Sequence, residues 1–179
     1  SLSNMNMMMQ QMMNIKQGFN QESINEMMDK FQDLLQDALY LSSQEEQLKS
    51  ETKQASRNSP RVRELAQRQQ LLQDQLNSVT NKMLKLSNKT FAITPDIGRG
   101  VGKANSNMEE AKRKLTERNL NQAGKNHDLA MEGLNETAQG LFNSMKSMME
   151  SGSASGFQQF LEMMQQMSGQ QQGLNQKGL

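Results

Sequence analysis

Cysteine and tryptophan are absent from this 179-residue sequence, and aromatic residues make up only 4% of it. The lack of cysteine rules out disulfides and thiolate metal sites, and it leaves the redox compartment open. A compact α/β or β-sandwich core would need more valine, isoleucine and aromatic residues than an apolar fraction of 34% supplies. Long polar helices need fewer, because each buries only a narrow apolar stripe. The scarcity of core-forming residues therefore favours an extended helical assembly.

An excess of charge of one sign is also lacking, since 20 basic and 19 acidic residues give a net charge of +1. The chain has no general field that would attract nucleic acid or an acidic membrane, and we expect no nucleic-acid partner. No apolar run approaches the roughly 20 residues that span a bilayer, so no membrane span is expected in this sequence. The chain opens at Ser1 and ends in a Gln/Gly-rich tail over residues 169–179, which we interpret as a fragment of a longer polypeptide.

What the sequence does contain is helical periodicity, which is clearest between Ser59 and Ile93. The apolar residues there, together with Gln69 and Thr90, step alternately by three and four, which predicts a long helix that packs against other helices. The packing and interaction residues that we expect to matter most lie in this stripe and in two later ones. They are Val62, Leu65, Leu72, Leu76, Val79, Met83, Leu86, Ile97 and Leu134.

Three further segments carry the same spacing. The stripe over residues 21–57 has Glu45 and Thr52 as polar interruptions, the stripe over residues 95–118 is thinner, and the stripe over residues 119–149 includes His127. Ser59-Pro60 and Thr94-Pro95 both have helix-start chemistry, with a capping side chain before a proline. The sequence therefore predicts an all-α fold, in which two long antiparallel hairpins pack as an elongated four-helix bundle with short Met-rich helices at the ends.

The segments outside the bundle are rich in methionine, of which the chain has 17. We predict a Met-rich terminal segment over residues 1–19, interrupted at Gly18 with Asn20 capping the next helix, and then the bundle over residues 20–150. Residues 151–179 are predicted as a flexible linker, a short amphipathic helix and a Gln/Gly-rich tail. Methionine sulfur could bind Cu(I), but adaptable packing between the two ends explains both clusters at once.

Few residues resemble a chemical site. The segment Gly98–Lys103 looks like a phosphate loop, but Ile97 stands at the position of the first glycine and Ala104 replaces the hydroxyl that would bind magnesium. Close approach of another helix, or a weakened first turn, explains these glycines better. We therefore predict no cofactor.

His127 is the only histidine, and no cysteine or acidic pair shares its helix face. We interpret it as a polar core or edge residue that sets the register of the helices, rather than as a metal ligand or a catalytic base. The adjacent carboxylates Glu45-Glu46 and Glu109-Glu110 point apart on a helix and are expected on solvated faces. No catalytic residue and no metal site are predicted.

Several motifs carry a resemblance. The corner Thr94-Pro95-Asp96-Ile97-Gly98-Arg99, the segment Leu115-Thr116-Glu117-Arg118-Asn119 and the Gln/Met-rich ending over residues 163–175 resemble the helical region of a family of large bacterial proteins of unknown function. The resemblance covers residues 31 to the end. Members of that family carry transmembrane helices near their N-terminus, so the resemblance implies the soluble helical part of a membrane-anchored cell-envelope protein. It brings no known catalytic residues.

These observations together predict a non-enzymatic structural or protein-interaction module, a fragment of a larger cell-envelope protein. Its partner would be another protein or other parts of the same longer chain, and self-association is also possible. The alternative is a chaperone-like or adaptor module that binds apolar peptides through its Met-rich faces.

Overall fold

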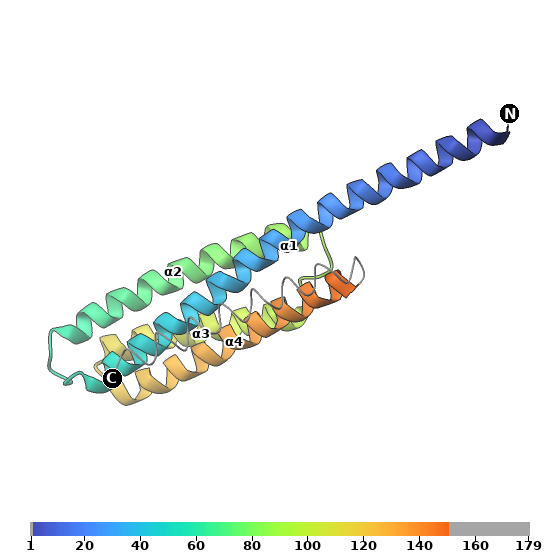
Figure 1. The fold of residues 1–179 in the computed structure, drawn as a ribbon. Coiled ribbons are helices and arrows are strands. Elements are labelled where there is room, and N and C mark those ends of the chain that lie inside the picture. The colour runs from blue at the N-terminus through green and yellow to red at the C-terminus, as the bar shows by residue number, and fades with distance from the viewer. Residues whose placement is uncertain (1, 151–179) are drawn as a thin grey trace, which may run out of the picture. The chain divides into compact units, whose positions relative to one another are not determined.

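The computed structural model describes residues 2–150, and within them the side chains of residues 24–150. Four helices follow one another along the chain: α1 (Leu2–Gln54), α2 (Arg61–Ser87), α3 (Pro95–Thr116) and α4 (Leu120–Glu150) (Figure 1). No strand occurs in this described part. The prediction of an all-α helical bundle is confirmed.

The chain divides into two units. The larger one, Asp29–Ser144, contains the paired stretches of all four helices. The other comprises Ser1–Met28 and Met145–Leu179, and it includes the beginning of α1 and the end of α4, where Lys146 and Glu150 lie 4.0 Å apart as an i,i+4 ion pair.

Within the larger unit each helix is antiparallel to the next one along the chain. Residue numbers rise along α1 as they fall along α2, because Asp37 pairs with Lys82 and Glu51 pairs with Arg68. The same reversal relates α2 to α3, where Lys112 donates to Gln70, and α3 to α4, where Lys103 pairs with Glu132.

The fourth contact closes the ring of helices, because α1 also lies antiparallel to α4. Ser42 donates to Asn135 at 2.9 Å, and Lys49 pairs with Asp128 at 2.5 Å. The two predicted hairpins therefore pack side by side with α1 next to α4 and α2 next to α3, as in an up-down-up-down bundle.

The predicted stripes form the core. All nine residues singled out from the sequence are buried, with 7% or less of each exposed. The positions that interrupt the stripes are buried as well: Glu45 and Thr52 on α1, Gln69 on α2 and His127 on α4 are each 0–1% exposed. Burial at three- and four-residue steps, polar positions included, means that each helix keeps one face toward its neighbours along the whole unit.

The predicted break at Gly18 is wrong, because α1 is one continuous helix from Leu2 to Gln54. Position 20 consequently lies inside the helix rather than at its start. A single glycine costs roughly 1 kcal/mol relative to alanine. Ending a helix and starting another would instead leave about four backbone groups unsatisfied at each new end, which favours continuation.

The two proline-containing starts are close to the prediction. At the first, the amide of Arg61 donates to the Ser59 hydroxyl at 3.2 Å, one turn before the buried Leu65. At the second, Thr94 is extended, with φ −79° and ψ 159°, and Pro95 opens α3 as predicted, but the Thr94 side chain makes no capping hydrogen bond, so the predicted cap is wrong there. Proline suits the first helical position because no amide hydrogen is needed there.

The β-branched, aromatic and apolar residues 90–93 predict a corner that packs under the end of the bundle, but the corner between α2 and α3 differs from this prediction. Phe91 is fully exposed, whereas Ala92 and Ile93 are half-buried. The Ser144 hydroxyl on α4 donates to the Ala92 carbonyl at 2.6 Å, which fixes the corner through its backbone. The adjacent side chain of Phe91 is left on the outside of the turn.

Helices α3 and α4 approach so closely that glycine is required at the crossing. A Cβ placed on Gly133 would lie 2.6 Å from the amide nitrogen of Ala104 and 2.7 Å from the carbonyl oxygen of Gly100. A Cβ on Gly100 would meet the Thr137 hydroxyl at 2.6 Å. The close-approach interpretation therefore holds for Gly100, while Gly98 and Gly102 face open space.

Candidate functional site

Four polar side chains meet inside the bundle, and we refer to Glu45, Thr52, Gln69 and His127 as the buried quartet. Glu45 and Thr52 lie seven residues apart on the inner face of α1, and Gln69 and His127 come from the inner faces of α2 and α4. Each is 0–1% exposed. The quartet exists because the polar interruptions of three separate stripes fall at the same level of the bundle.

The Glu45 carboxylate is the centre of the quartet. Its Oε2 lies 2.7 Å from His127 Nδ1, and its Oε1 accepts a short hydrogen bond from the Gln69 amide. On the other side of the imidazole, Thr52 Oγ1 lies 3.4 Å from His127 Nε2. The Gln69 carbonyl oxygen is buried without a hydrogen-bond partner among the described residues. A carboxylate can be buried when both of its oxygens have hydrogen-bond partners, as they do here.

The order carboxylate, imidazole and hydroxyl is that of a catalytic triad, in which the acid orients the base and the base activates the hydroxyl. Here the Thr52 hydroxyl is 3.4 Å from the ring nitrogen, beyond normal hydrogen-bond length for such a pair. Only 1% of Thr52 is exposed, so a substrate carbonyl cannot reach that hydroxyl while the helices are packed. The arrangement fits a structural polar layer better than a nucleophile.

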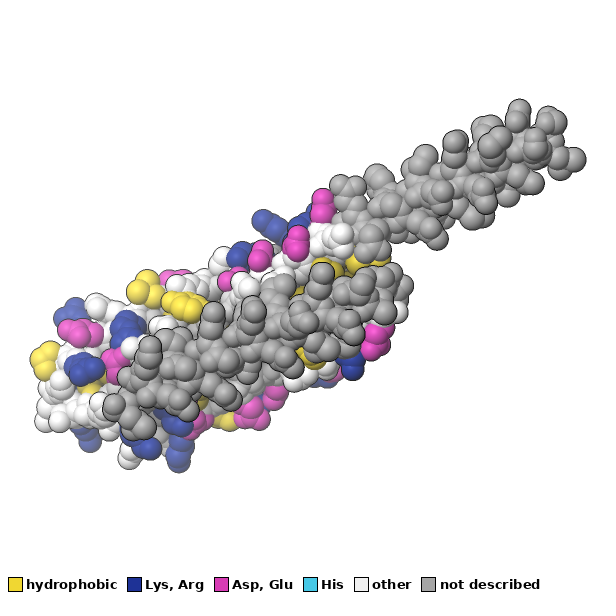
Figure 2. Space-filling model, viewed as in Figure 1, with side chains coloured by type: hydrophobic (Ala, Val, Ile, Leu, Met, Phe, Trp, Pro, Cys, Tyr) yellow, Lys and Arg dark blue, Asp and Glu magenta, His cyan; other side chains and the backbone are white. Residues whose placement is uncertain are grey.

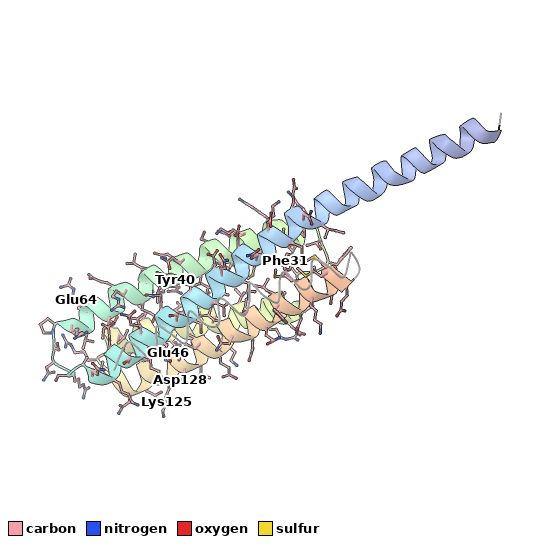
Figure 3. The ribbon with its side chains drawn as sticks, in the orientation of Figure 1. Phe31, Tyr40, Glu46, Glu64, Lys125 and Asp128 are labelled. Atoms are coloured by element: carbon pink, nitrogen blue, oxygen red, sulfur yellow. The ribbon has the colours of Figure 1, made fainter. Side chains whose placement is uncertain are left out.

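A hollow of about 360 Å³ lies next to the quartet, between the end of α1 and the start of α4. Thr52 forms part of its lining, with Lys49, Lys53, Lys125 and Asp128 around it. Lys49 is held by Asp128 in the 2.5 Å ion pair, and both Lys125 and Asp128 lie along α4 in Figure 3. The hollow therefore ends at Thr52 and does not open onto His127, whose side chain is 0% exposed.

A second, half-buried polar cluster joins α2 to α3. Lys112 Nζ donates to the side-chain oxygen of Gln70 at 2.7 Å and to that of Gln73 at 3.4 Å, and the Gln73 amide donates to Asn105 at 3.4 Å. Three amides and one ammonium offer no nucleophile or proton-transfer pair. This cluster is consistent with fixing the two helices relative to each other.

Charged groups at the helix surfaces are paired across neighbours, and two of these pairings shift a pKa. The Arg68 guanidinium, 2.8 Å from both oxygens of Glu51, holds the pKa of that carboxyl below its ordinary value, with Arg61 adding to the effect. On the opposite pair of helices, hydrogen bonds from Lys103 to Glu132 and Glu136 raise the pKa of the Lys103 ammonium. Exposed pairs of this kind contribute little individually, with a median of about 0–1 kcal/mol.

The nine residues selected from the sequence are not brought together at one place. They lie along the core on three helices: seven on α2, Ile97 on α3 and Leu134 on α4. Their packing is observed, whereas a role in binding a partner stays a prediction. The lookalike of a phosphate loop, residues 98–103, lies entirely inside α3, so its amides belong to a helix rather than to a phosphate-binding loop.

Sequence reasoning missed the quartet because it treated its members separately. Glu45 was expected on a solvated face beside Glu46; only Glu46 is exposed, so that expectation is wrong for Glu45. The available signal was its place in the stripe of α1, seven residues before Thr52, at a position that faces inward. Among the described residues, no group of three or more His, Cys, Asp or Glu side chains is arranged to hold a metal ion.

Comparisons with known proteins identify a family but no function. No curated protein and no solved structure matches the chain. The helices of the described residues include none that is both long and apolar enough to span a membrane. A family model described as a domain of unknown function (DUF4175) matches residues 36–177, which is most of the chain and includes the whole buried quartet. The chain therefore belongs to the DUF4175 family.

Proposed function

We propose that this domain is a non-enzymatic structural and protein-interaction module of a larger protein. The observation that carries the proposal is that the side chains of the buried quartet are closed off from solvent. His127 is the chain's only histidine, and it is 0% exposed with its ring held between Glu45 and Thr52. A base that no substrate can reach supports a role in the fold rather than in a reaction.

The role that we assign to the quartet is to select one register of the four helices. Apolar stripes at heptad spacing would also pack after a slip of seven residues, because leucine replaces leucine or valine. Such a slip would separate Glu45 from His127 and leave a buried carboxylate unpaired. Leaving a buried polar group without its hydrogen-bond partner costs about 1–3 kcal/mol, and more if the group is charged, which disfavours the slipped arrangement.

We further propose that the larger protein is a membrane-anchored protein of the cell envelope. This part rests on the resemblance of the helical sequence to that family of bacterial proteins. The domain would act as a rigid helical part that holds or contacts other elements of the envelope protein.

The competing interpretation is a chaperone-like module that binds apolar peptides through methionine faces. Met83, Met108 and Met145 are 0–4% exposed, so these three take part in the core. The side chains of the predicted N-terminal face, Met5 to Met13, and of the predicted C-terminal piece, residues 157–167, lie outside the described residues. Neither face supports the chaperone interpretation over the structural one.

One pair of measurements on the whole chain tests the proposal. A structural module should show no saturable binding of an apolar fluorescent dye before the urea transition. It should also show no hydrolysis of an activated ester that depends on His127. Dye binding by the folded chain would favour the chaperone interpretation. Ester hydrolysis that His127→Gln abolishes, at an unchanged urea midpoint, would instead show an enzyme.

A further inference from the structure

Charged residues are distributed unevenly along the bundle, although the net charge of the chain is only +1. The loop between α1 and α2 and the turn between α3 and α4 lie at one end of the larger unit, where Arg118 of the turn donates to the Arg57 carbonyl of the loop. Residues 47–68 and 109–127 comprise this loop and this turn with eight helical residues on each side, and we call them the basic end. They hold 11 of the 20 basic residues and 5 of the 19 acidic ones, so the basic end has a net charge of +6.

Ion pairs within the basic end do not neutralise this charge. Three of its carboxylates, Glu51, Glu110 and Glu117, are already held by arginine or lysine side chains of the same end. Four basic side chains form no ion pair or hydrogen bond with any described residue: Lys53, Arg57, Arg63 and Lys125. Figure 2 shows Lys and Arg side chains gathered on the visible face of this end. The basic end therefore has a positive potential that attracts anions.

The hollow of about 360 Å³ beside the buried quartet lies at this basic end. Its lining includes Lys49, Thr52 and Lys53 from α1 and Lys125 and Asp128 from α4. Lys49 is held by Asp128 at 2.5 Å, whereas Lys53 and Lys125 have no ion pair among the described residues. Two unpaired ammonium groups, one from each of two neighbouring helices, therefore border a single polar hollow.

The helix ends beside the hollow do not account for its positive charge. α1 ends there and α4 begins there, so the negative pole of one helix dipole lies next to the positive pole of the other. These partial charges oppose each other. The attraction for an anion comes from the lysine side chains.

The charge and the size of the hollow both indicate the class of anion. Three lysines and one aspartate give its lining a net charge of +2. A phosphate monoester carries about −1.5 to −2 at neutral pH and matches that charge, whereas one carboxylate would leave an ammonium group uncompensated. The volume of about 360 Å³ is at the lower end of the range for ligand sites, about 300–1,000 Å³, which suits a small group rather than a length of polymer.

We propose that this hollow binds a phosphate monoester, which Lys53 contacts from α1 and Lys125 contacts from α4. The unpaired Arg57 and Arg63 at the same end strengthen the positive field that attracts the ligand. A soluble phosphorylated molecule and the headgroup of a phosphatidate lipid present the same chemistry to the site. Ligand binding goes beyond the proposed structural function and does not depend on it.

Two probes test the proposal on the whole 179-residue chain: glycerol 3-phosphate, and phosphatidylcholine vesicles that contain phosphatidate. Titration at constant ionic strength, followed by amide resonances for the soluble probe and by co-sedimentation for the vesicles, should show saturable binding of at least one probe. The double variant Lys53→Gln with Lys125→Gln should weaken that binding at least about tenfold, because each substitution removes a charge-assisted hydrogen bond. Its urea midpoint should not change, because both lysines are exposed and unpaired.

The matched control, Lys85→Gln with Lys89→Gln, removes two exposed lysines of α2 outside the basic end and should bind as the native chain does. Saturation by glycerol 3-phosphate would identify a soluble ligand, and binding of the vesicles alone would identify a lipid headgroup. Binding of neither probe, or an equal loss in the control, would overturn the proposal. So would binding of a glutamate-rich peptide or of duplex DNA in place of both probes. The structural function would stand even then, because the dye and ester measurements test it separately.

Discussion

Arg118 reaches from the end of α3 to the loop between α1 and α2, where its guanidinium donates to the Arg57 carbonyl at 2.7 Å. A longer contact of 3.4 Å joins the same nitrogen to the Ser59 carbonyl. Arg118 has φ 58°, a left-handed conformation that usually selects glycine. Its amide and that of Asn119 donate back to α3, at Leu115 and Lys114, which closes the helix as a Schellman motif. One residue therefore ends α3 and links two loops.

Replacing Arg118 separates these two roles. Arg118→Ala removes the hydrogen bonds to the loop and keeps the left-handed strain of about 1–2 kcal/mol. Arg118→Gly removes the same bonds but relieves the strain. We expect Arg118→Gly to be the more stable of the two by about 1 kcal/mol, measured from urea midpoints at equal slopes. A glycine variant less stable than the alanine variant would mean that Arg118 is not strained.

The crossing of α3 and α4 predicts opposite effects of the same substitution at two glycines of α4. Gly133→Ala drives a methyl group into the backbone of α3, which cannot move aside as a side chain can, and should destabilise by about 1–3 kcal/mol or more. Gly124→Ala, with nothing within 4 Å, should stabilise by up to about 1 kcal/mol through helix propensity. Thermal unfolding of both variants checks the ordering, and a neutral Gly133→Ala would show that the helices are further apart.

The core and the helix starts could be predicted from sequence because they depend on local spacing. Buried positions such as Leu76 and Met108 recur at steps of three and four, and a proline after serine or threonine marks a first turn wherever it occurs. The sequence also placed Glu45, Thr52, Gln69 and His127 within stripes. It could not show that they share one level, because that depends on the stagger between helices far apart in the chain.

Two local features escaped prediction for a different reason. Gly18 was predicted to end a helix, although a difference of about 1 kcal/mol in helix propensity is easily overridden by the rest of the structure. Phe91 was expected inside because it is large and apolar. The turn is instead held by a hydrogen bond from Ser144 to a backbone carbonyl, and nothing in the sequence of the corner identifies that donor.

The buried quartet should behave as one unit. His127→Leu removes the hydrogen-bond partner of Glu45 Oε2 and leaves that oxygen unsatisfied inside the bundle, so we expect a loss of about 1–3 kcal/mol or more. The triple variant Glu45→Leu, Gln69→Leu and His127→Leu removes the orphaned groups together and should lose less than the single variant. Urea unfolding measures both. If the triple variant lost as much as the Glu45→Leu, Gln69→Leu and His127→Leu single variants summed, these three side chains would be energetically independent.

The register role makes a separate prediction for the same triple variant. Without the quartet, slipped arrangements of the helices no longer leave a carboxylate unpaired, so the bundle should sample more than one packing. Broadened or doubled amide resonances in the bundle, at retained helix content, are the expected result. Ser42→Ala, which removes an exposed hydrogen bond to Asn135 between α1 and α4, serves as the control and should leave the spectrum sharp.

The pair Glu51–Arg68 gives the bundle a dependence on pH whose sign follows from the contacts. Glu51 is held by hydrogen bonds from Arg68 and Arg61, and its side chain is 17% exposed. The folded-state pKa is lowered, whereas in the unfolded chain a glutamate titrates near about 4.3. Folding therefore favours the ionised form. The resulting stability is fully present above the unfolded pKa and is lost as the pH falls through the folded pKa.

A double-mutant cycle of Glu51→Gln and Arg68→Gln isolates this contribution from the other carboxylates. At pH 7 we expect a favourable coupling free energy of about 1 kcal/mol, in the range for a partly exposed ion pair. The coupling should be unchanged down to about pH 5 and should then decline as Glu51 becomes protonated in the folded state, since a neutral carboxyl no longer attracts the guanidinium. Urea unfolding of the four chains at several pH values measures it. A coupling that is the same at pH 2.5 as at pH 7, or that grows on acidification, would show that the hydrogen bonds between Arg68 and the ionised Glu51 do not stabilise the α1–α2 hairpin.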